Sequence, residues 1–118
     1  MAKKLDIKPL VRVSFYNPDS ELHSVMGTGV TELLKGVKEF GSLRKAAINM
    51  GMAYSKAWRI VSKTSEAFGF ELIISKIPKG STLSNEAEAL LDAYTEINDE
   101  LQKQAEELFK EKMTNHLS

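Results

Sequence analysis

The sequence predicts an α+β fold, and three observations carry that prediction. Short segments rich in β-branched residues lie near residue 11 and near residue 72. Between them, two helical segments meet at Gly51. The stretch from Glu86 to about Met113 contains neither glycine nor proline, so we expect one long helix there. The 118 residues fit one domain, 1–118.

The N-terminal part predicts a strand pair followed by a helix. Apolar and polar residues alternate over 10–16, which is the period of a half-buried strand. A turn signal follows at 17–20, so residues 21–26 could pair back as a second strand. After Gly27-Thr28-Gly29, apolar residues recur on one face of a helix that we expect to end at Gly41.

Residues 42–68 predict a helix-turn-helix. Ser42 can cap the first helix, and Gly51 supplies the left-handed turn before the second. Two helices that cross steeply need small residues at the crossing, and Ala47 lies four residues before the glycine. We expect five apolar side chains to point inward: Ala46, Met50, Met52, Ala57 and Ile60. We also expect Trp58 to anchor in the core.

The hairpin after this motif would make it a winged helix-turn-helix over residues 8–83. Residues 70–77 form a β-rich apolar run, 78–80 a tight turn, and 81–83 a short returning strand. Ser84 can cap the long helix, 84–113. Its apolar residues alternate in spacings of four and three, with Gln104 between, as in a heptad seam. We expect residues 84–95 to pack on the chain's own domain, whereas residues 96–113 extend too far for that and favour a homodimer. The seam would consist of Leu90, Tyr94, Ile97, Leu101 and Leu108.

Charge is balanced overall but separated along the chain. Residues 42–83 carry seven cations against two acids, or +5, while 84–118 carry three cations against nine acids, or −6. Such asymmetry indicates an anion-seeking middle segment. The absence of cysteine excludes disulfides and fits a reducing cytoplasm, and no apolar run is long enough to span a membrane.

These features together predict duplex DNA as the partner. The second helix of a helix-turn-helix lies in the major groove, where Lys56, Arg59 and Lys63 would share one face at spacings of three and four. Arg59 could contact guanine, and the lysines phosphate or guanine. An exposed Trp58 could stack on a base, although we expect it to anchor the core. The full predicted interface comprises Ser42, Arg44, Lys45, Tyr54, Ser55, Lys56, Arg59 and Lys63, with Lys76 and Lys79 on the wing.

Catalytic, cofactor and metal sites are not expected. His23 and His116 are far apart in the sequence, and neither has a second ligand at metal spacing. Adjacent Glu106 and Glu107 cannot face each other as an acid–base pair. The alternative to a DNA-binding regulator is therefore another binding module, a winged-helix adaptor that docks a protein through its acidic helix.

The stretch GSLRKAAINMGMAYSKAWRIVSKTSEAFGFELI, residues 41–73, resembles the winged-helix DNA-binding domain of ModE-type molybdate-responsive transcription regulators. The Tyr-x-x-Ala-Trp-Arg segment is the most specific part of a resemblance that covers roughly residues 8–96. It implies a DNA-binding transcription regulator. The matching residues are Gly41, Ser42, Leu43, Ala46, Ala47, Met50, Gly51, Met52, Tyr54, Ala57, Trp58, Arg59 and Ile60.

Three departures from the family pattern limit what the resemblance implies. Ala53 stands where the family has serine, so the second helix lacks a capping oxygen. Ser55 replaces an arginine or lysine, and the glycine-rich wing is shortened to residues 77–81. The oxyanion-binding domains that follow in the family have no counterpart in these 118 residues, so molybdate binding is not expected.

Overall fold

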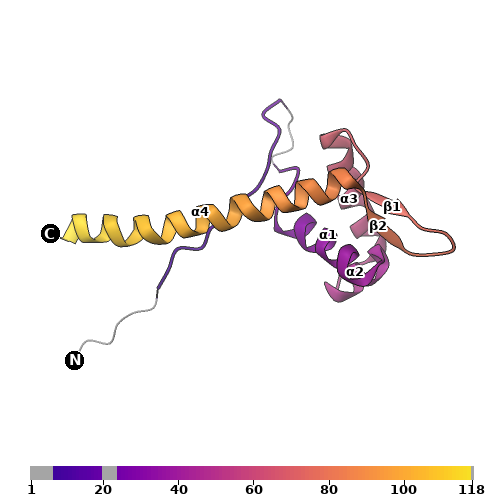
Figure 1. Cartoon of the computed structure of the whole chain (residues 1–118), viewed down its shortest axis with the longest axis horizontal. Coiled ribbons are helices and arrows are strands. Elements are labelled where there is room, and N and C mark those ends of the chain that lie inside the picture. Colours follow the sequence, from indigo (N-terminus) through magenta and orange to yellow (C-terminus); the bar gives the residue numbers. More distant parts are fainter. Residues whose placement is uncertain (1–6, 20–23, 118) are drawn as a thin grey trace.

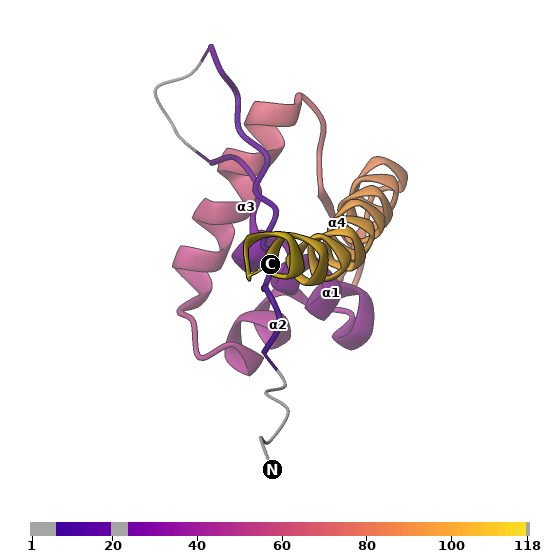
Figure 2. The ribbon, with the colours of Figure 1, turned by 90° about the vertical axis from the view of Figure 1, so that its left-hand side faces the viewer.

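The computed structural model describes residues 7–19 and 24–117. Helices α1 (Thr28–Phe40), α2 (Leu43–Asn49) and α3 (Tyr54–Phe68) come first, followed by strands β1 (Ile73–Ser75) and β2 (Ser81–Leu83). Helix α4 (Asn85–Leu117) ends the described chain and projects far beyond the other helices (Figure 1). Viewed from its C-terminal end, α2 and α3 lie to one side of α4 (Figure 2).

Local backbone chemistry sets the helix boundaries where the sequence predicts them. Gly41 adopts φ 72°, and its N–H donates to the Val37 carbonyl at 2.8 Å, which closes α1. The Ser42 hydroxyl accepts from the Lys45 N–H at 3.2 Å and caps α2. Gly51 has φ 65° in the turn before α3, a conformation that a side chain would strain. The predicted helix-turn-helix is therefore present.

The core lies where α1, α2 and α3 meet the hairpin and the first turns of α4. Leu33 and Leu34 of α1 are fully buried, as are Ala57 and Leu72. Helices α1 and α2 approach so closely at Gly36 that a Cβ added there would lie 2.6 Å from the Ala46 Cβ. Small residues at this crossing permit the two helices to pack against each other.

The hairpin is shorter than the sequence predicts. Antiparallel β1 and β2 pair only over Ile73–Ser75 and Ser81–Leu83, and the Lys76 N–H donates to the Gly80 carbonyl at 3.0 Å near the tip. The Ser81 N–H donates to the Gly41 carbonyl at 2.8 Å, which ties the hairpin to the junction of α1 and α2. The hairpin projects beyond the helices as a wing (Figure 1).

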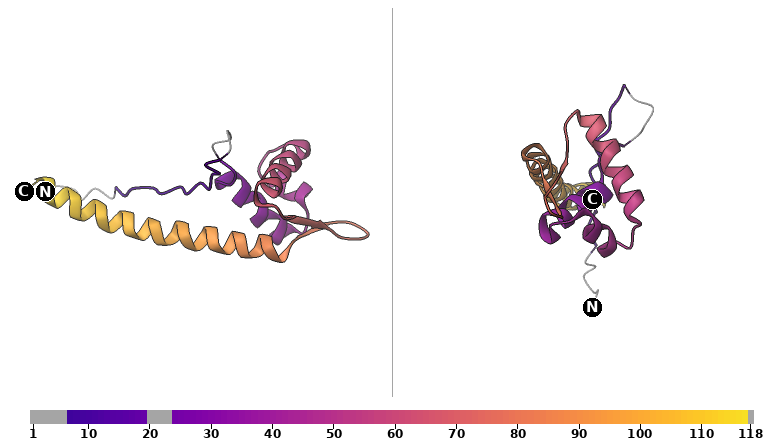
Figure 3. Two further views of the ribbon diagram at one scale, coloured as in Figure 1. Left: turned by 90° about the horizontal axis from the view of Figure 1, so that it is seen from above. Right: turned by 90° about the vertical axis from the view of Figure 1, so that its right-hand side faces the viewer.

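Among the described residues, the expected N-terminal strand pair is reduced to a single bridge between Phe15 and Met26. Residue 20 of the expected turn and residues 21–23 of the expected second strand, including His23, lie outside the described residues. Residues 9–13 pair instead with α4 and run alongside it in the opposite direction (Figure 3). The polar atoms that a strand partner would satisfy are thus satisfied by side chains of a helix.

Two amides and one phenol of α4 hold this N-terminal segment. The Gln102 amide accepts from the Val11 N–H and donates to the Pro9 carbonyl, both at 2.8 Å. The Asn98 amide oxygen accepts from the Val13 N–H at 2.9 Å. The Tyr94 hydroxyl donates to the Val13 carbonyl, and its ring meets Phe15 edge to face.

Helix α4 begins at the predicted cap and runs slightly further than predicted. The Ser84 hydroxyl accepts from the Ala87 N–H at 3.0 Å and donates to the Glu71 carbonyl at 2.6 Å. The element order and the wing make this an α+β winged helix-turn-helix with a long C-terminal helix. None of the helices in residues 7–19 and 24–117 combines the length and apolar character that a membrane crossing needs.

Candidate nucleic-acid interface

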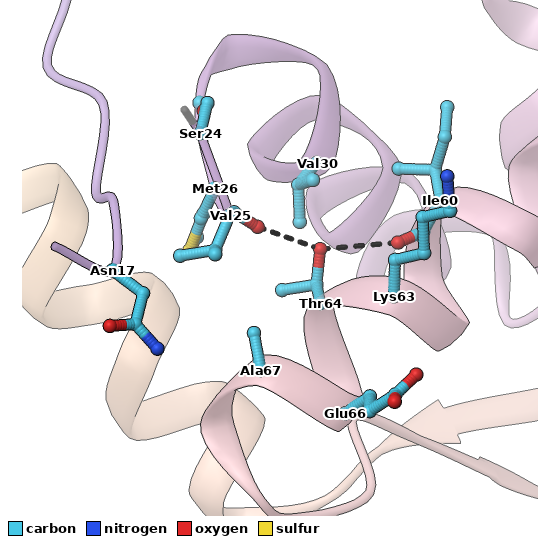
Figure 4. Close-up of a pocket in the computed structure, with 11 residues that line it drawn as sticks. Asn17, Ser24, Val25, Met26, Val30, Ile60, Lys63, Thr64, Glu66 and Ala67 are labelled. Carbon is cyan, nitrogen blue, oxygen red and sulfur yellow. Dashed lines mark hydrogen bonds between the residues drawn. The ribbon is translucent and has the colours of Figure 1, made fainter. Parts of the chain in front are cut away.

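Helix α3 is held against the domain by one buried face. Ala57, Val61 and Thr64 are buried there. The Thr64 hydroxyl donates to the Val25 carbonyl at 2.8 Å and also approaches the Ile60 carbonyl at 3.1 Å (Figure 4). This contact fixes the rotation of α3, so the side chains that point away from the core are set by the fold.

The opposite face of α3 carries the predicted DNA-binding side chains, all of them exposed. Lys56, Arg59 and Lys63 point to solvent, with Tyr54 and Ser55 at the N-terminal end of the helix. Among residues 7–19 and 24–117, the one ion pair within 4 Å joins Lys35 to Glu32. The cations of α3 therefore have no carboxylate partner within the described part of the chain.

Helix α2 adds two more cations to this surface. Arg44 and Lys45 are exposed in its first turn. The Arg44 guanidinium carbon lies 4.2 Å from the centroid of the Tyr54 ring, which links α2 to the start of α3. The Ser42 hydroxyl caps α2, so its oxygen is already engaged. From residue 41 to residue 65 the chain has these five cations and no acid.

The N-terminus of α3 lacks a side-chain cap, as the alanine at position 53 predicts. Ala53 has extended backbone and makes no capping hydrogen bond from its side chain. Its carbonyl accepts from the N–H groups of Lys56 and Ala57, both at 3.1 Å. The helix therefore starts through backbone bonds alone.

The wing presents Lys76 and Lys79 on either side of Ile77 and Pro78. All four side chains are exposed, and Ile77 is 98% exposed. Since the base of the wing is bonded to Gly41, the wing and the first turn of α2 belong to the same end of the domain. The structure thus holds cations on α2, α3 and the wing.

Trp58 is not the core anchor that the sequence predicts, because half of its surface is exposed. It lies one residue beyond buried Ala57, so the 100° turn per residue places it on the flank of α3 rather than on the buried face. There it borders a surface hollow with Phe70 and Ile73. The apolar neighbours Ala57 and Ile60 in the sequence did not reveal this, since they lie on another face.

A second hollow, of about 580 Å³, lies where α3 meets the segment before α1 (Figure 4). Val25, Met26 and Val30 form its apolar wall, and Lys63 and Glu66 of α3 also line it. No sequence motif indicated it. No group of histidine, cysteine or acidic side chains in residues 7–19 and 24–117 could hold a metal ion.

The predicted dimer seam separates into two parts. Leu90 packs against the core and Tyr94 is 5% exposed, so these two residues face their own domain. Their assignment to the seam is therefore corrected: they do not belong to an exposed face of α4. Ile97, Leu101 and Leu108 are 40–48% exposed. Any helix-to-helix seam on α4 therefore has to start at Ile97.

Comparison with known proteins supports the fold. No family model matches the sequence, and neither does any curated protein. Among solved structures, the complex of the CbnR DNA-binding domain with DNA matches with a TM-score of 0.55 at 17% sequence identity. The match covers 64% of this chain and 86% of the CbnR domain chain. At this identity the likeness shows that the chain shares the fold of a DNA-binding domain.

Proposed function

We propose that this protein is a sequence-specific duplex-DNA-binding transcriptional regulator that acts as a homodimer. The carrying observation is the exposed face of α3, where Lys56, Arg59 and Lys63 have no acidic partner among the described residues. A second helix of a helix-turn-helix with such a face fits the major groove. The CbnR domain, which shares the fold, was solved with DNA.

The predicted residues of α3 and of the wing have distinct roles in this proposal. Arg59, near the middle of the face, would read guanine through its two-pronged guanidinium, while Lys56 and Lys63 neutralise phosphates on either side. Ser55 would lie at the groove. Lys76 and Lys79 would contact the backbone from the wing. Kinship with ModE-type regulators belongs to the same proposal and rests on the Tyr-x-x-Ala-Trp-Arg pattern. Location in the cytoplasm belongs to it as well and rests on the absence of cysteine.

Dimerisation through α4 would place two α3 helices on one duplex. Helix α4 has 33 residues, or roughly 50 Å at 1.5 Å per residue, and its C-terminal half projects from the domain (Figure 1). Ile97, Leu101 and Leu108 follow one another at spacings of four and seven, so they lie along one stripe. A two-fold dimer would contact half-sites about 34 Å apart or a multiple of that spacing.

The DNA test measures binding to a random-sequence duplex pool at several salt concentrations, for the wild type and Arg59→Ala. Enrichment of a two-fold symmetric motif is expected, with affinity falling steeply as salt rises, since phosphate contacts release counterions. Arg59→Ala should lose about 1–3 kcal/mol of discrimination at one base pair. Lys103→Ala on α4 removes the same charge away from the face and serves as the control. Weak binding whose affinity changes neither with salt concentration nor on Arg59→Ala would refute DNA recognition.

The dimer test compares the mass in solution of the wild type, Leu101→Glu and Lys103→Glu. Both variants introduce a glutamate on α4, but only Leu101→Glu places it on the proposed stripe. We expect that variant to be monomeric and the control to remain dimeric. A monomeric wild type at DNA-binding concentrations would rule out the dimer while leaving the DNA-binding proposal intact.

A protein-docking adaptor is the second candidate, and half-exposed Trp58 favours it. Exposed tryptophan is enriched where proteins contact each other. The hollow beside Trp58 is bordered by Glu66 and Glu71, which would repel phosphate. Salt separates the two functions, because an apolar protein contact lacks the steep salt dependence of phosphate binding.

A further inference from the structure

Arg44 and Tyr54 form a cation–π pair that joins two helices of the helix-turn-helix. The guanidinium carbon lies 4.2 Å from the ring centroid, well inside the roughly 6 Å range of a cation–π contact. Tyr54 is 41% exposed, and Arg44 is exposed on α2. Within the described residues, Arg44 has neither an ion pair nor a side-chain hydrogen bond, so the ring is its one recorded side-chain partner.

We infer that Tyr54 is a positioning residue that holds the Arg44 guanidinium ready for a DNA phosphate, rather than a residue that itself reads the groove. This inference rests on the proposed DNA-binding function and deepens it. The guanidinium contacts the ring on one side, 4.2 Å from its centroid, and the N–H groups on its other side remain available to donate. Those groups match a phosphate with two parallel hydrogen bonds.

The pair differs in this respect from the cation beside it. Lys45 is exposed in the same turn of α2 but, within the described residues, lies over no aromatic ring. A long free side chain loses rotamer entropy when it binds phosphate, and a side chain already held in place loses less. Arg44 should therefore contribute more to DNA affinity than Lys45, and the difference should depend on the ring.

The pair also carries information about helix arrangement. Arg44 belongs to the first turn of α2, and Tyr54 is the first residue of α3. The contact spans the turn through Gly51 and so joins the start of α2 to the start of α3. A phosphate bound by Arg44 would thus lie at a fixed position beside the N-terminal end of α3, where Ser55 begins the exposed face.

The test is a double-mutant cycle on duplex DNA affinity, using the motif selected by the wild type. Tyr54→Leu should weaken binding about three- to tenfold, and Tyr54→Phe should restore wild-type affinity because it keeps the ring. Arg44→Ala should weaken binding and lower the slope of log affinity against log salt by about 0.9, the value for one phosphate. In the Arg44→Ala background, Tyr54→Leu should have no further effect.

Lys45→Ala is the matched control, since it removes a cation from the same turn. Tyr54→Leu should keep its full effect in that background. Arg44→Lys should weaken binding less than Arg44→Ala and keep the wild-type salt slope, because a lysine keeps the charge but cannot donate two parallel bonds. Circular dichroism and urea unfolding of every variant show whether it is folded, and Tyr54→Phe with Arg44→Lys tests the pair even if Tyr54→Leu unfolds.

Several results would overturn the inference. If Tyr54→Phe is as harmful as Tyr54→Leu, the hydroxyl contacts DNA directly. If Tyr54→Leu weakens binding equally with and without Arg44, the two side chains act independently. A wild type that binds DNA and loses affinity on Arg59→Ala, but not on Tyr54→Leu, would refute this inference alone. A wild type without salt-dependent DNA binding would refute the proposed function, and this inference with it.

Discussion

Replacing Gly36 by alanine tests the close packing of α1 on α2. The added Cβ would lie 2.6 Å from the Ala46 Cβ and 3.1 Å from its Cα. Carbon atoms in contact are normally about 3.5–4.0 Å apart, so the helices would have to separate by roughly 1 Å. Neither Cβ can rotate away, because each is bonded directly to the backbone. The strain therefore falls on the helix crossing itself.

The expected net effect is a loss of about 2 kcal/mol in the free energy of unfolding. Overpacking a core costs about 1–3 kcal/mol, and the upper end applies where two helices must shift. Alanine is a better helix former than glycine by about 1 kcal/mol, which offsets part of that cost. With a urea slope of about 1–3 kcal/mol/M, the unfolding midpoint should fall by roughly 1 M.

Helix α1 contains its own control for this experiment. Gly29 lies in the same helix, and a Cβ added there meets nothing within 4 Å. Gly29→Ala should therefore be neutral or slightly stabilising. The double variant Gly36→Ala with Ala46→Gly exchanges the two partners and should recover most of the lost stability. All variants should be compared at one protein concentration, because a dimer gains stability with concentration.

The packing argument fails if Gly36→Ala unfolds at the same urea concentration as Gly29→Ala. It also fails if Ala46→Gly does not rescue Gly36→Ala, because the clash would then lie elsewhere. A loss of stability that the exchange reverses would show that the α1–α2 separation is set at this one contact.

Three further predictions follow from single contacts. Gln102→Ala should cost about 1 kcal/mol of stability and speed amide exchange at Val11, whereas Lys103→Ala, which truncates an exposed side chain away from the proposed seam, should do neither. Thr64→Val should cost about 1–2 kcal/mol in urea unfolding, because the Val25 carbonyl loses its donor while the side-chain volume is kept. Lys79→Ala should lower the salt slope of DNA binding by about 0.9 and leave the urea midpoint unchanged, since the side chain is exposed on the wing.

Helix boundaries were predictable because their chemistry is local. Gly41 ends α1 in a left-handed conformation, and Ser42 and Ser84 cap helices through bonds that span three residues. Each signal involves residues close in the chain, so one short stretch contains both partners. The helix-turn-helix followed from the same kind of evidence, together with the glycine at its turn.

Long-range partners were not predictable in the same way. The bonds of Asn98 and Gln102 reach back 85–93 residues, and nothing in an amide side chain indicates where its partner lies. The alternation over 10–16 was a real signal of an extended segment, but a helix takes the place of the expected second strand. Gly36 likewise gave no sign of its contact with Ala46, because that contact exists only after two helices pack.

The candidate interface was predictable in composition and less so in arrangement. Charge segregation identified the cations of α2 and α3, and the structure exposes all five. Trp58 was predicted in the core because Ala57 and Ile60 near it are apolar. Its side chain lies on the flank of α3 instead, on a different face from these two residues. The Arg44–Tyr54 contact was missed because it joins residues of two helices.

Helix α4 shows why its heptad pattern suggested a longer seam than the structure allows. Tyr94, Asn98 and Gln102 recur every four residues and form the face that binds the N-terminal segment. Ile97 and Leu101 recur on the adjacent face, which is exposed. The sequence pattern merged the two faces because Tyr94 is apolar enough to fit either one.

This division constrains how two α4 helices could pair. A partner helix has to lie beside the N-terminal segment, along Ile97, Leu101 and Leu108, and it brings a second helix with nine acids against three lysines. Repulsion between two such helices weakens as salt screens it, so the dimer should strengthen with salt. DNA binding by the α3 face should weaken with salt over the same range. If one protein both dimerises and binds DNA, its DNA affinity should peak at intermediate ionic strength. This peak should appear at protein concentrations near the dimer dissociation constant. The DNA affinity of the monomeric Leu101→Glu variant should only fall as salt rises.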